Sequence, residues 1–385
     1  MSHAESAALV DRLHARGGHR VHSFAWRDLD DPEAGGSEVH ADEIFRRWAA
    51  AGLHVVHRTS TFDVPRTFER NGYTVTQEGG RVGVLARTPM HGLLRDRRQA
   101  DVVVDIWNGV PWWSPLWFRG PRVTWLHHLH SEMWRQSFPV PLAIAGATIE
   151  ARVAPFVYRS EGVVTLSKSS RDGLLGHGFH GHLVDVIQPG IDDRFSAVPD
   201  MRHPTPLVVA VGRLAPVKRY LALCASIDAF RHLMPQVRLE IVGDGPDRAA
   251  LEQWRDAHEA HEWLVLRGRV DDAELVSTYR RAWVAVSASL AEGWGMSLTE
   301  AAACGAPAVA TNIAGHRDAV VDGVTGVLVD EAGQLGKVVA ELLADTSRLA
   351  ALRAGALARA ATLTWDAAAA AHLGVVVRQC TARSW

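Results

Sequence analysis

Two carboxylates stand eight positions apart, at Glu292 and Glu300, on either side of a predicted helix start. Glu292 lies in the loop AEGWG, after a predicted strand at 283–287, and Glu300 falls among the helix formers that follow. Glycines let a loop backbone approach a ligand closely, and the unpaired N–H groups of a helix start attract an anion. The residues that would form this anion site are Gly293, Gly295, Met296 and Ser297. Taken alone, the pattern is equally typical of a capped helix with two solvated acids.

Two cations, Arg213 and Lys218, follow a predicted strand at 207–211 and stand five positions apart at a strand-to-helix turn. An arginine can fork onto a phosphate through two N–H groups, whereas a lysine acts as a point charge. The pair is therefore suited to a diphosphate, although cations at such a turn can also be simply solvated.

Glycines recur at two other strand ends. Gly35 and Gly36 open a predicted helix after the first strand, where a glycine pair either approaches phosphate or sugar or forms a plain turn. Gly243 follows the strand 238–242, but a dinucleotide fingerprint needs a third glycine where Arg248 stands. Hydride chemistry is therefore not indicated.

Two groups of residues could hold a metal ion. A run of histidines that includes His127 and His128 follows the strand 122–126, at the strand end where ligands of parallel sheets bind. No fourth ligand is placed there, so a metal cluster is disfavoured. Asp28 and Asp30 form an Asp-x-Asp triplet, which binds a divalent metal in one class of transferase; such triplets are frequent by chance, and a solvated loop is the favoured interpretation.

Alternating strands and helices predict two parallel, doubly wound sheets. A hairpin is expected over 73–85 with its turn at Gly79 and Gly80, and three prolines mark 197–206 as a linker. Aromatic residues between 107 and 118 are expected to pack locally, with an acceptor-binding wall as the alternative. The predicted strands are 19–26, 55–59, 101–106, 122–126, 162–167, 183–187, 207–211, 238–242, 265–270, 283–287, 308–311 and 327–329.

Glu292 and Glu300 with these glycines, together with Arg213 and Lys218 in order, resemble the donor site of the retaining family-4 glycosyltransferases (glycosyl transferases group 1). The resemblance runs over nearly the whole chain and is stronger in its second half. It implies the GT-B fold, in which two Rossmann-like domains face each other across a cleft. The expected domains are an acceptor-side domain at 1–195, to which a last helix at about 366–385 returns, and a donor domain at 206–365.

The resemblance also implies roles for the residues. Glu292 would contact the transferred sugar, Glu300 the ribose hydroxyls, and the backbone near Val270 the base. His127, with His128 as the fallback, would contact the donor sugar. The catalytic set is His127, Glu292, Arg213 and Lys218. The donor-binding set is Gly35, Gly36, His128, Arg213, Lys218, Gly243, Val270, Glu292, Gly293, Trp294, Gly295, Met296, Ser297 and Glu300.

Composition narrows the class of protein. A formal net charge of −2 over 385 residues indicates no surface for nucleic acid, so no nucleic-acid partner is expected. Three cysteines without metal spacing predict a reducing compartment. The N-terminus lacks the apolar core of a signal peptide, and no run of about 18 apolar residues exists. A cytoplasmic location is expected, and peripheral membrane contact stays open.

The resemblance therefore implies a hexosyltransferase that moves a sugar from a UDP- or GDP-sugar, with retention and without a metal or other cofactor. The acceptor would be a sugar, a lipid-linked glycan or a small molecule such as a cyclitol. The alternatives are a catalytically inactive subunit that binds a sugar or nucleotide, and a metal-dependent transferase using Asp28 and Asp30.

Overall fold

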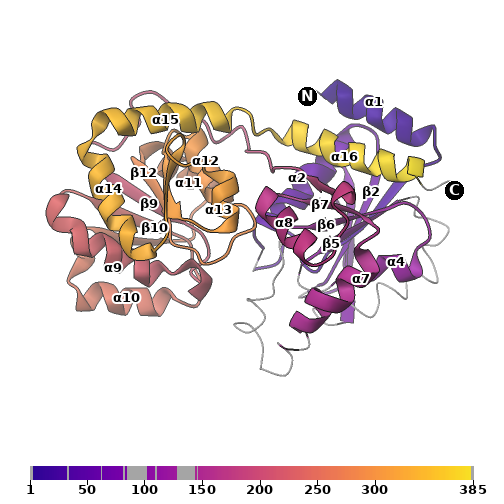
Figure 1. Cartoon of the computed structure of the whole chain (residues 1–385), viewed down its shortest axis with the longest axis horizontal. Coiled ribbons are helices and arrows are strands. Elements are labelled where there is room, and N and C mark those ends of the chain that lie inside the picture. The colour runs from indigo at the N-terminus through magenta and orange to yellow at the C-terminus, as the bar shows by residue number, and fades with distance from the viewer. Residues whose placement is uncertain are drawn as a thin grey trace. The chain divides into compact units, whose positions relative to one another are not determined.

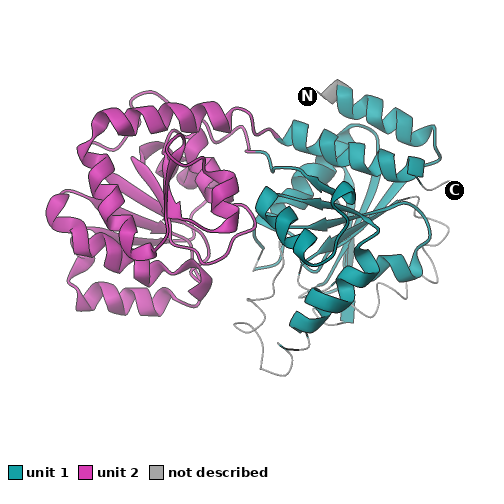
Figure 2. Ribbon diagram, viewed as in Figure 1, with its two compact units in different colours: residues 1–190, 365–385 teal, residues 191–364 magenta. Residues whose placement is uncertain are grey.

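The computed structural model describes residues 3–32, 34–61, 63–80, 83–84, 102–108, 111–127, 144 and 146–382. The chain divides into two compact units, one formed by residues 1–190 and 365–385 and the other by residues 191–364 (Figure 2). No helix among the described residues is long and apolar enough to cross a membrane. Each unit is an α/β layer structure and is described by itself.

The described part of unit 1 contains an eight-stranded sheet in the order β3-β4-β2-β1-β5-β6-β7-β8. All neighbouring strands run parallel except the edge pair β3–β4, which is antiparallel. The strands are β1 (Arg20–Phe24), β2 (His54–Thr59), β3 (Arg66–Arg70), β4 (Tyr73–Gln77), β5 (Val102–Trp107), β6 (Arg122–Leu126), β7 (Gly162–Thr165) and β8 (Val184–Val186).

The β3–β4 hairpin turns at Asn71 and Gly72, which both have positive φ (48° and 85°). Asn-Gly with two positive φ angles suits the tight turn whose twist matches that of paired strands. The hairpin expected over 73–85 is therefore wrong: Tyr73–Gln77 pairs with the strand before it, and Gly79 and Gly80 lie beyond the pair.

Helices cover the sheet of unit 1, and chain ends far apart in sequence lie side by side there (Figure 1). α16 packs on α1, α2 and β6, and the Trp48 indole donates to the Ala369 carbonyl oxygen at 2.9 Å. The expected local packing of the aromatic loop is confirmed for Trp107, Trp112 and Trp117, whose rings are buried. The helical elements are α1 (His3–His14), α2 (Gly36–Ala50), α4 (Ser114–Trp117), η2 (Ile149–Val153), α7 (Ala154–Tyr158), α8 (Lys168–Gly176), η3 (Gly181–Leu183) and α16 (Trp365–Ala382).

Unit 2 contains an all-parallel sheet of six strands in the order β11-β10-β9-β12-β13-β14. The central strand β9, LVVAV, is a continuous apolar run, as is typical of a strand with helices on both faces of its sheet. The strands are β9 (Leu207–Val211), β10 (Arg238–Val242), β11 (Leu264–Gly268), β12 (Val284–Ser287), β13 (Ala308–Thr311) and β14 (Gly326–Val329).

The helices of unit 2 alternate with these strands. They are η4 (Pro216–Lys218), α9 (Tyr220–Phe230), η5 (Arg231–Leu233), α10 (Arg248–Ala257), η6 (Ala260–Glu262), α11 (Asp272–Arg281), α12 (Met296–Ala303), α13 (Ala314–Ala319), η7 (Ala332–Gln334), α14 (Leu335–Ala344) and α15 (Thr346–Ala360). The segment 197–206, expected to be a linker, belongs to unit 2, where the His203 carbonyl accepts from the Trp283 indole at 2.8 Å.

In each sheet the strands are added first on one side and then on the other, and the two adjacent strands between which the side changes form the topological switch point. In unit 2 it lies between β9 and β12, because β10 and β11 extend to one side of β9 and β13 and β14 to the other. In unit 1 it lies between β1 and β5. Ligands of open parallel sheets bind outside the carboxyl ends of the strands at such a point.

Candidate functional site

The loops that follow β9 and β12 meet through an ion pair between Lys218 and Glu292. The Lys218 ammonium donates to Glu292 Oε1, and the Ser289 hydroxyl donates to the same oxygen at 2.8 Å. Both charged side chains are partly buried. Two residues 74 positions apart are thus held together at the switch point of the sheet.

The surroundings of Glu292 keep it ionised. Burial alone would raise the pKa of its carboxyl group, but the Lys218 cation, His316 and the Ser289 hydrogen bond outweigh burial and lower it. Burial lowers the pKa of His316, whose Nδ1 donates to the Thr311 carbonyl at 2.8 Å. The site therefore contains the neutral imidazole of His316 and the ionised carboxylate of Glu292.

Glycines let the backbone of this loop turn sharply and pack closely. Gly295 has a φ of 113° and directly precedes α12, so the first N–H groups of that helix, at Met296 and Ser297, have no preceding turn to bond. A Cβ on Gly315 would lie 2.3 Å from the Glu292 carbonyl oxygen. The helix start and Glu292 are consequently fixed against α13. Within the loop Trp294 is buried and Gly293 is partly buried.

The loops after β9 and β10 touch through their backbones. Gly243 has a φ of 139°, and a Cβ there would lie 2.0 Å from the Gly212 carbonyl oxygen. Arg213 lies in the loop after β9 and is exposed. Val270 follows β11 in the loop before α11. The segments that follow the carboxyl ends of β9, β10, β11 and β12, α12 included, therefore carry all of the predicted donor-site residues of unit 2, and their contacts with a donor stay predictions.

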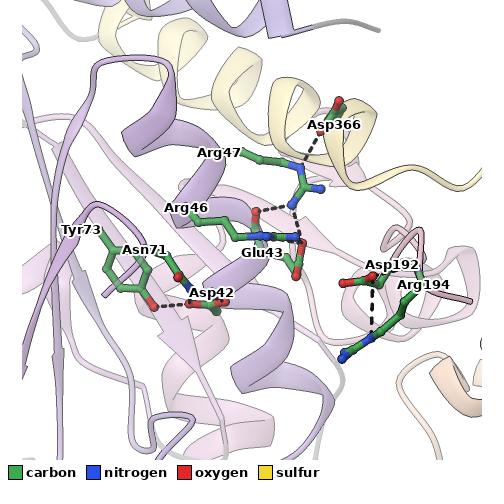
Figure 3. Close-up of polar contacts among 9 residues, drawn as sticks. All are labelled: Asp42, Glu43, Arg46, Arg47, Asn71, Tyr73, Asp192, Arg194 and Asp366. Carbon is green, nitrogen blue, oxygen red and sulfur yellow. Dashed lines mark hydrogen bonds and ion pairs between the residues drawn. The ribbon is translucent and has the colours of Figure 1, made fainter. Parts of the chain in front are cut away.

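Glu300 sits one turn inside α12 and has a different environment from Glu292. The Tyr279 hydroxyl of α11 donates to Glu300 Oε2 at 3.1 Å. Burial raises the pKa of Glu300 to about 7, against the lowering effects of Tyr279 and Arg194. Figure 3 shows Arg194 beside Asp192, with 3.7 Å between Arg194 Nε and Asp192 Oδ1. Near neutral pH Glu300 is therefore only partly ionised.

In unit 1 the loops after β1 and β5 are joined at the second switch point. Gly35 precedes α2 and donates its N–H to Glu38 Oε2 at 2.8 Å, closing the helix start. The Asn108 amide donates to the Ser37 hydroxyl at 2.9 Å. Gly36 is the first residue of α2, so both predicted glycines lie at this strand end.

His127 directly follows β6, and its ring is buried rather than open to solvent. Its Nε2 faces His40 Nδ1 at 3.3 Å, and its carbonyl oxygen accepts from the Ser170 hydroxyl. The His40 ring also lies 5.0 Å from that of His372, and burial lowers the pKa of both histidines, that of His372 to about 3. His128 lies outside the described residues. The donor-sugar role of either histidine stays a prediction.

The structure corrects the interpretation of Asp28 as part of a solvated loop. Asp28 is buried and accepts from Arg70 at 2.6 Å and from Gln77 at 2.7 Å. Asp30 accepts from Arg66 at 2.6 Å and pairs with Arg70 at 2.8 Å. Both carboxylates thus tie the loop after β1 to the hairpin, because Arg66 and Arg70 are the first and last residues of β3.

Around Glu292 and Glu300, three side chains of unit 2 were not singled out from the sequence: Ser289, His316 and Tyr279. Ser289 could have been found from its position three residues before Glu292, a spacing at which a hydroxyl can reach a carboxylate. His316 and Tyr279 carry no such local signal, since α13 and α11 bring them in from other parts of the chain.

Two family profiles match adjoining parts of the chain: Glycosyltransferase Family 4 over residues 34–195 and Glycosyl transferases group 1 over residues 192–359. A D-inositol 3-phosphate glycosyltransferase from Xylanimonas cellulosilytica is 33% identical over 90% of this chain and 93% of its own length. The chain belongs to the family-4 glycosyltransferases. The predicted enzyme class is therefore confirmed.

One further relative by sequence and two solved structures are also similar to this family-4 glycosyltransferase. A GDP-mannose-dependent phosphatidylinositol monomannoside mannosyltransferase from Mycolicibacterium smegmatis is 28% identical over 74% of this chain and 78% of its own length. The solved structure of a sucrose-phosphate synthase from Thermosynechococcus elongatus matches with a TM-score of 0.80 at 21% identity, covering 94% of this chain and 99% of that one. HepE of Anabaena in complex with UDP-glucose matches with a TM-score of 0.70 at 18% identity, covering 94% and 98%. The predicted GT-B fold is confirmed.

Proposed function

We propose that this glycosyltransferase moves a hexose from a nucleotide-diphosphate sugar to an acceptor hydroxyl, with retention at the anomeric carbon and without a metal ion in the chemical step. The observation that carries the proposal is the Lys218–Glu292 pair, held at the switch point of the donor-side sheet beside the start of α12. Membership of family 4 supports retention.

In this proposal the cationic and the anionic residues have different roles. Lys218 and Arg213 balance the charge that develops on the leaving diphosphate, and the N–H groups at Met296 and Ser297 add a fixed dipole. Lys218 donates to Glu292, so a donor phosphate would compete for the ammonium while Glu292 would turn its acceptor oxygens to the sugar hydroxyls. Because protein cations supply the positive charge, a metal ion is not needed in this step.

The proposed nucleotide and acceptor are inferred from the names of similar proteins. A UDP- or GDP-sugar is proposed because one relative is named for GDP-mannose and one matching structure holds UDP-glucose. Glu300 would accept from the ribose hydroxyls. The acceptor is a sugar, a lipid-linked glycan or a small cyclitol, and the inositol phosphate in the name of one relative makes a cyclitol the first to test.

A screen of UDP- and GDP-hexoses tests the proposal. Full-length protein is incubated with each donor, with and without inositol phosphate, and release of the nucleoside diphosphate and the anomer of the product are measured. One donor should be turned over with retention, and activity should persist in EDTA. Activity that EDTA abolishes and magnesium restores would instead support the metal-dependent alternative. A donor that raises the melting temperature but is never turned over would support an inactive binding subunit.

A further inference from the structure

Unit 1 exposes a row of apolar side chains along one helical stretch. Residues 146–158 form a continuous helix that includes η2 and α7, and Ile149, Val153 and Phe156 are exposed along it, Phe156 by 69%. The neighbouring α4 adds Leu116, which is 70% exposed. Figure 1 shows α4 and α7 side by side, and the two elements are in contact. Single exposed apolar residues are ordinary, but a grouped set is typical of an interaction surface.

The opposite face of the same helix is buried, so the stretch is amphipathic. Glu150, Ala154 and Tyr158 point into the unit, at spacings of four residues. Pro155 lacks an N–H, and the preceding turn widens so that the Ala154 N–H bonds to the Ile149 carbonyl. Ile149, Val153 and Phe156 stand at i, i+4 and i+7, a spacing that places them together on the outward face.

A buried carboxyl group holds both helices of this face in place. Asp105 of β5 accepts from the Ser114 hydroxyl of α4 at 2.7 Å and from the Tyr158 hydroxyl of α7 at 2.6 Å. Asp105 is fully buried in the core of the unit. The outward face is therefore a rigid part of the fold, because its inner side is fixed at two points.

The exposed charged residues that the structure describes within 111–127 and 146–160 are all arginines. Arg119, Arg152 and Arg159 are exposed at its edges, and the Arg159 guanidinium lies over the Phe156 ring at 4.8 Å. Within 111–127 and 146–160 the described residues include no exposed carboxylate, since Glu150 is buried. Apolar side chains flanked by arginines match the acyl region and the headgroups of an anionic bilayer.

We propose that the face formed by Leu116, Ile149, Val153 and Phe156, with Arg119, Arg152 and Arg159 around it, docks on an anionic phospholipid surface. A second copy of the chain fits less well, because a twofold contact through this face would set arginines against arginines. The proposal is independent of the transfer chemistry, and it places the acceptor-side unit where a lipid-linked acceptor would be found.

Co-sedimentation of the full chain with vesicles tests the proposal. Vesicles of phosphatidylcholine are compared with vesicles that also contain phosphatidylglycerol. We expect binding to the second kind only, weakened by high salt because the arginines contribute through charge. Leu116→Asp and Phe156→Asp should each weaken binding by about tenfold or more. Leu233→Asp is the matched control: Leu233 is 61% exposed on η5 of unit 2 and should leave binding unchanged.

Three results would overturn the proposal: no binding of the unmodified protein to anionic vesicles, equal losses in Leu116→Asp and Leu233→Asp, or a concentration-dependent dimer that Phe156→Asp dissociates. Circular dichroism checks that each variant is folded. Donor turnover without vesicles separates this proposal from the proposed function. A protein that binds vesicles but turns over no donor would contradict only the proposed function. A protein that turns over a donor but does not bind vesicles would contradict only the docking face.

Discussion

At the level of single residues, the ion pair between Lys218 and Glu292 makes the charge clamp testable. If Lys218 and Arg213 stabilise the leaving diphosphate, Lys218→Ala and Arg213→Ala should each lower kcat by about a hundredfold or more, with smaller changes in KM. The double variant should lose less than the product of the two factors, because both cations act on one charge. Steady-state kinetics with a fixed donor give these values.

Lys337→Ala is the control for the clamp, since Lys337 is an exposed lysine of α14. A further consequence is specific to Lys218: its removal leaves Glu292 partly buried without its cation, so the pKa of Glu292 should rise. The acidic limb of the pH–rate profile should then move to higher pH in Lys218→Ala but stay in place in Lys337→Ala. A folded Lys218 variant with unchanged kcat would exclude the clamp.

Glu300 predicts a pH dependence of nucleotide binding. Its pKa is raised to about 7 by burial, so protonation below that pH removes an acceptor for the ribose hydroxyls. The affinity for a nucleoside diphosphate should therefore increase as the pH rises through about 7. Glu300→Gln should weaken binding by about one to two decades and abolish this dependence, since a charge-assisted hydrogen bond is worth ~1.5–3 kcal/mol. Titration calorimetry at several pH values measures both effects.

Glu300 should also make the stability of the unliganded protein depend on pH, with the opposite sign from its effect on nucleotide binding. Between its ordinary pKa and about 7, Glu300 binds more protons in the folded than in the unfolded chain. Its contribution to the free energy of unfolding should therefore fall as the pH rises through this window. Urea unfolding of the unmodified protein and of Glu300→Gln gives the difference, and an equal pH slope for both proteins would mean that the pKa of Glu300 is not raised.

His127 is predicted to act mainly on the sugar in the transition state, so His127→Ala should slow transfer more than it weakens donor binding. The structure adds a control, because the ring is buried against His40. His40→Ala removes the same contact from the other side, so loss of packing alone should affect both variants alike. Equal losses of rate in His127→Ala and His40→Ala would assign the effect to packing, and a loss confined to a His128 variant would move the role by one residue.

At the level of elements, close backbone contact between the loops after β9 and β10 predicts which glycine is indispensable. Gly243→Ala places a methyl group 2.0 Å from the Gly212 carbonyl and should force the two loops apart. Gly178→Ala is the matched control: its φ is also positive, at 87°, but nothing lies within 4 Å of an added Cβ. The control should lose ~1–2 kcal/mol from backbone strain alone, and Gly243→Ala should lose more.

Thermal unfolding and donor affinity separate the two parts of that prediction. Gly243→Ala should weaken donor binding as well as lower the melting temperature, because Gly212 leads directly into the Arg213–Lys218 turn. Equal destabilisation of the two variants would show that the loops can separate without strain.

At the level of the whole molecule, unit 1 is completed by the far end of the chain. α16 supplies Trp365, His372 and Val376 to its core and accepts a hydrogen bond from Trp48. A chain ending at residue 364 should therefore lose protection from hydrogen exchange throughout unit 1, while the six-stranded sheet of unit 2 keeps it. Arg378→Ala, which removes only an exposed ion pair from α16, should keep protection in both units. Protection of unit 1 in the shortened chain would contradict this dependence.

Several features of the protein could be predicted from the sequence because they depend on short stretches of chain. The predicted strands of both sheets agree with the observed ones to within two residues at each end, since continuous apolar runs are characteristic of buried parallel strands. The family membership followed from Glu292, Glu300, Arg213 and Lys218 in order. The β3–β4 turn was missed although its signal, Asn71-Gly72, is local.

Only the tertiary structure decided how these residues are paired. Lys218 and Glu292 are 74 residues apart, and His127 and His40 are 87 apart, so no spacing in the sequence relates them. Asp28 was interpreted as solvated because its arginine partner comes from the hairpin, 42 residues away. Local sequence determines which strand end carries a side chain, because strand and loop propensities act over a few residues. The order of the strands in the sheet determines which strand ends become neighbours, and with them the partner, burial and pKa of each side chain.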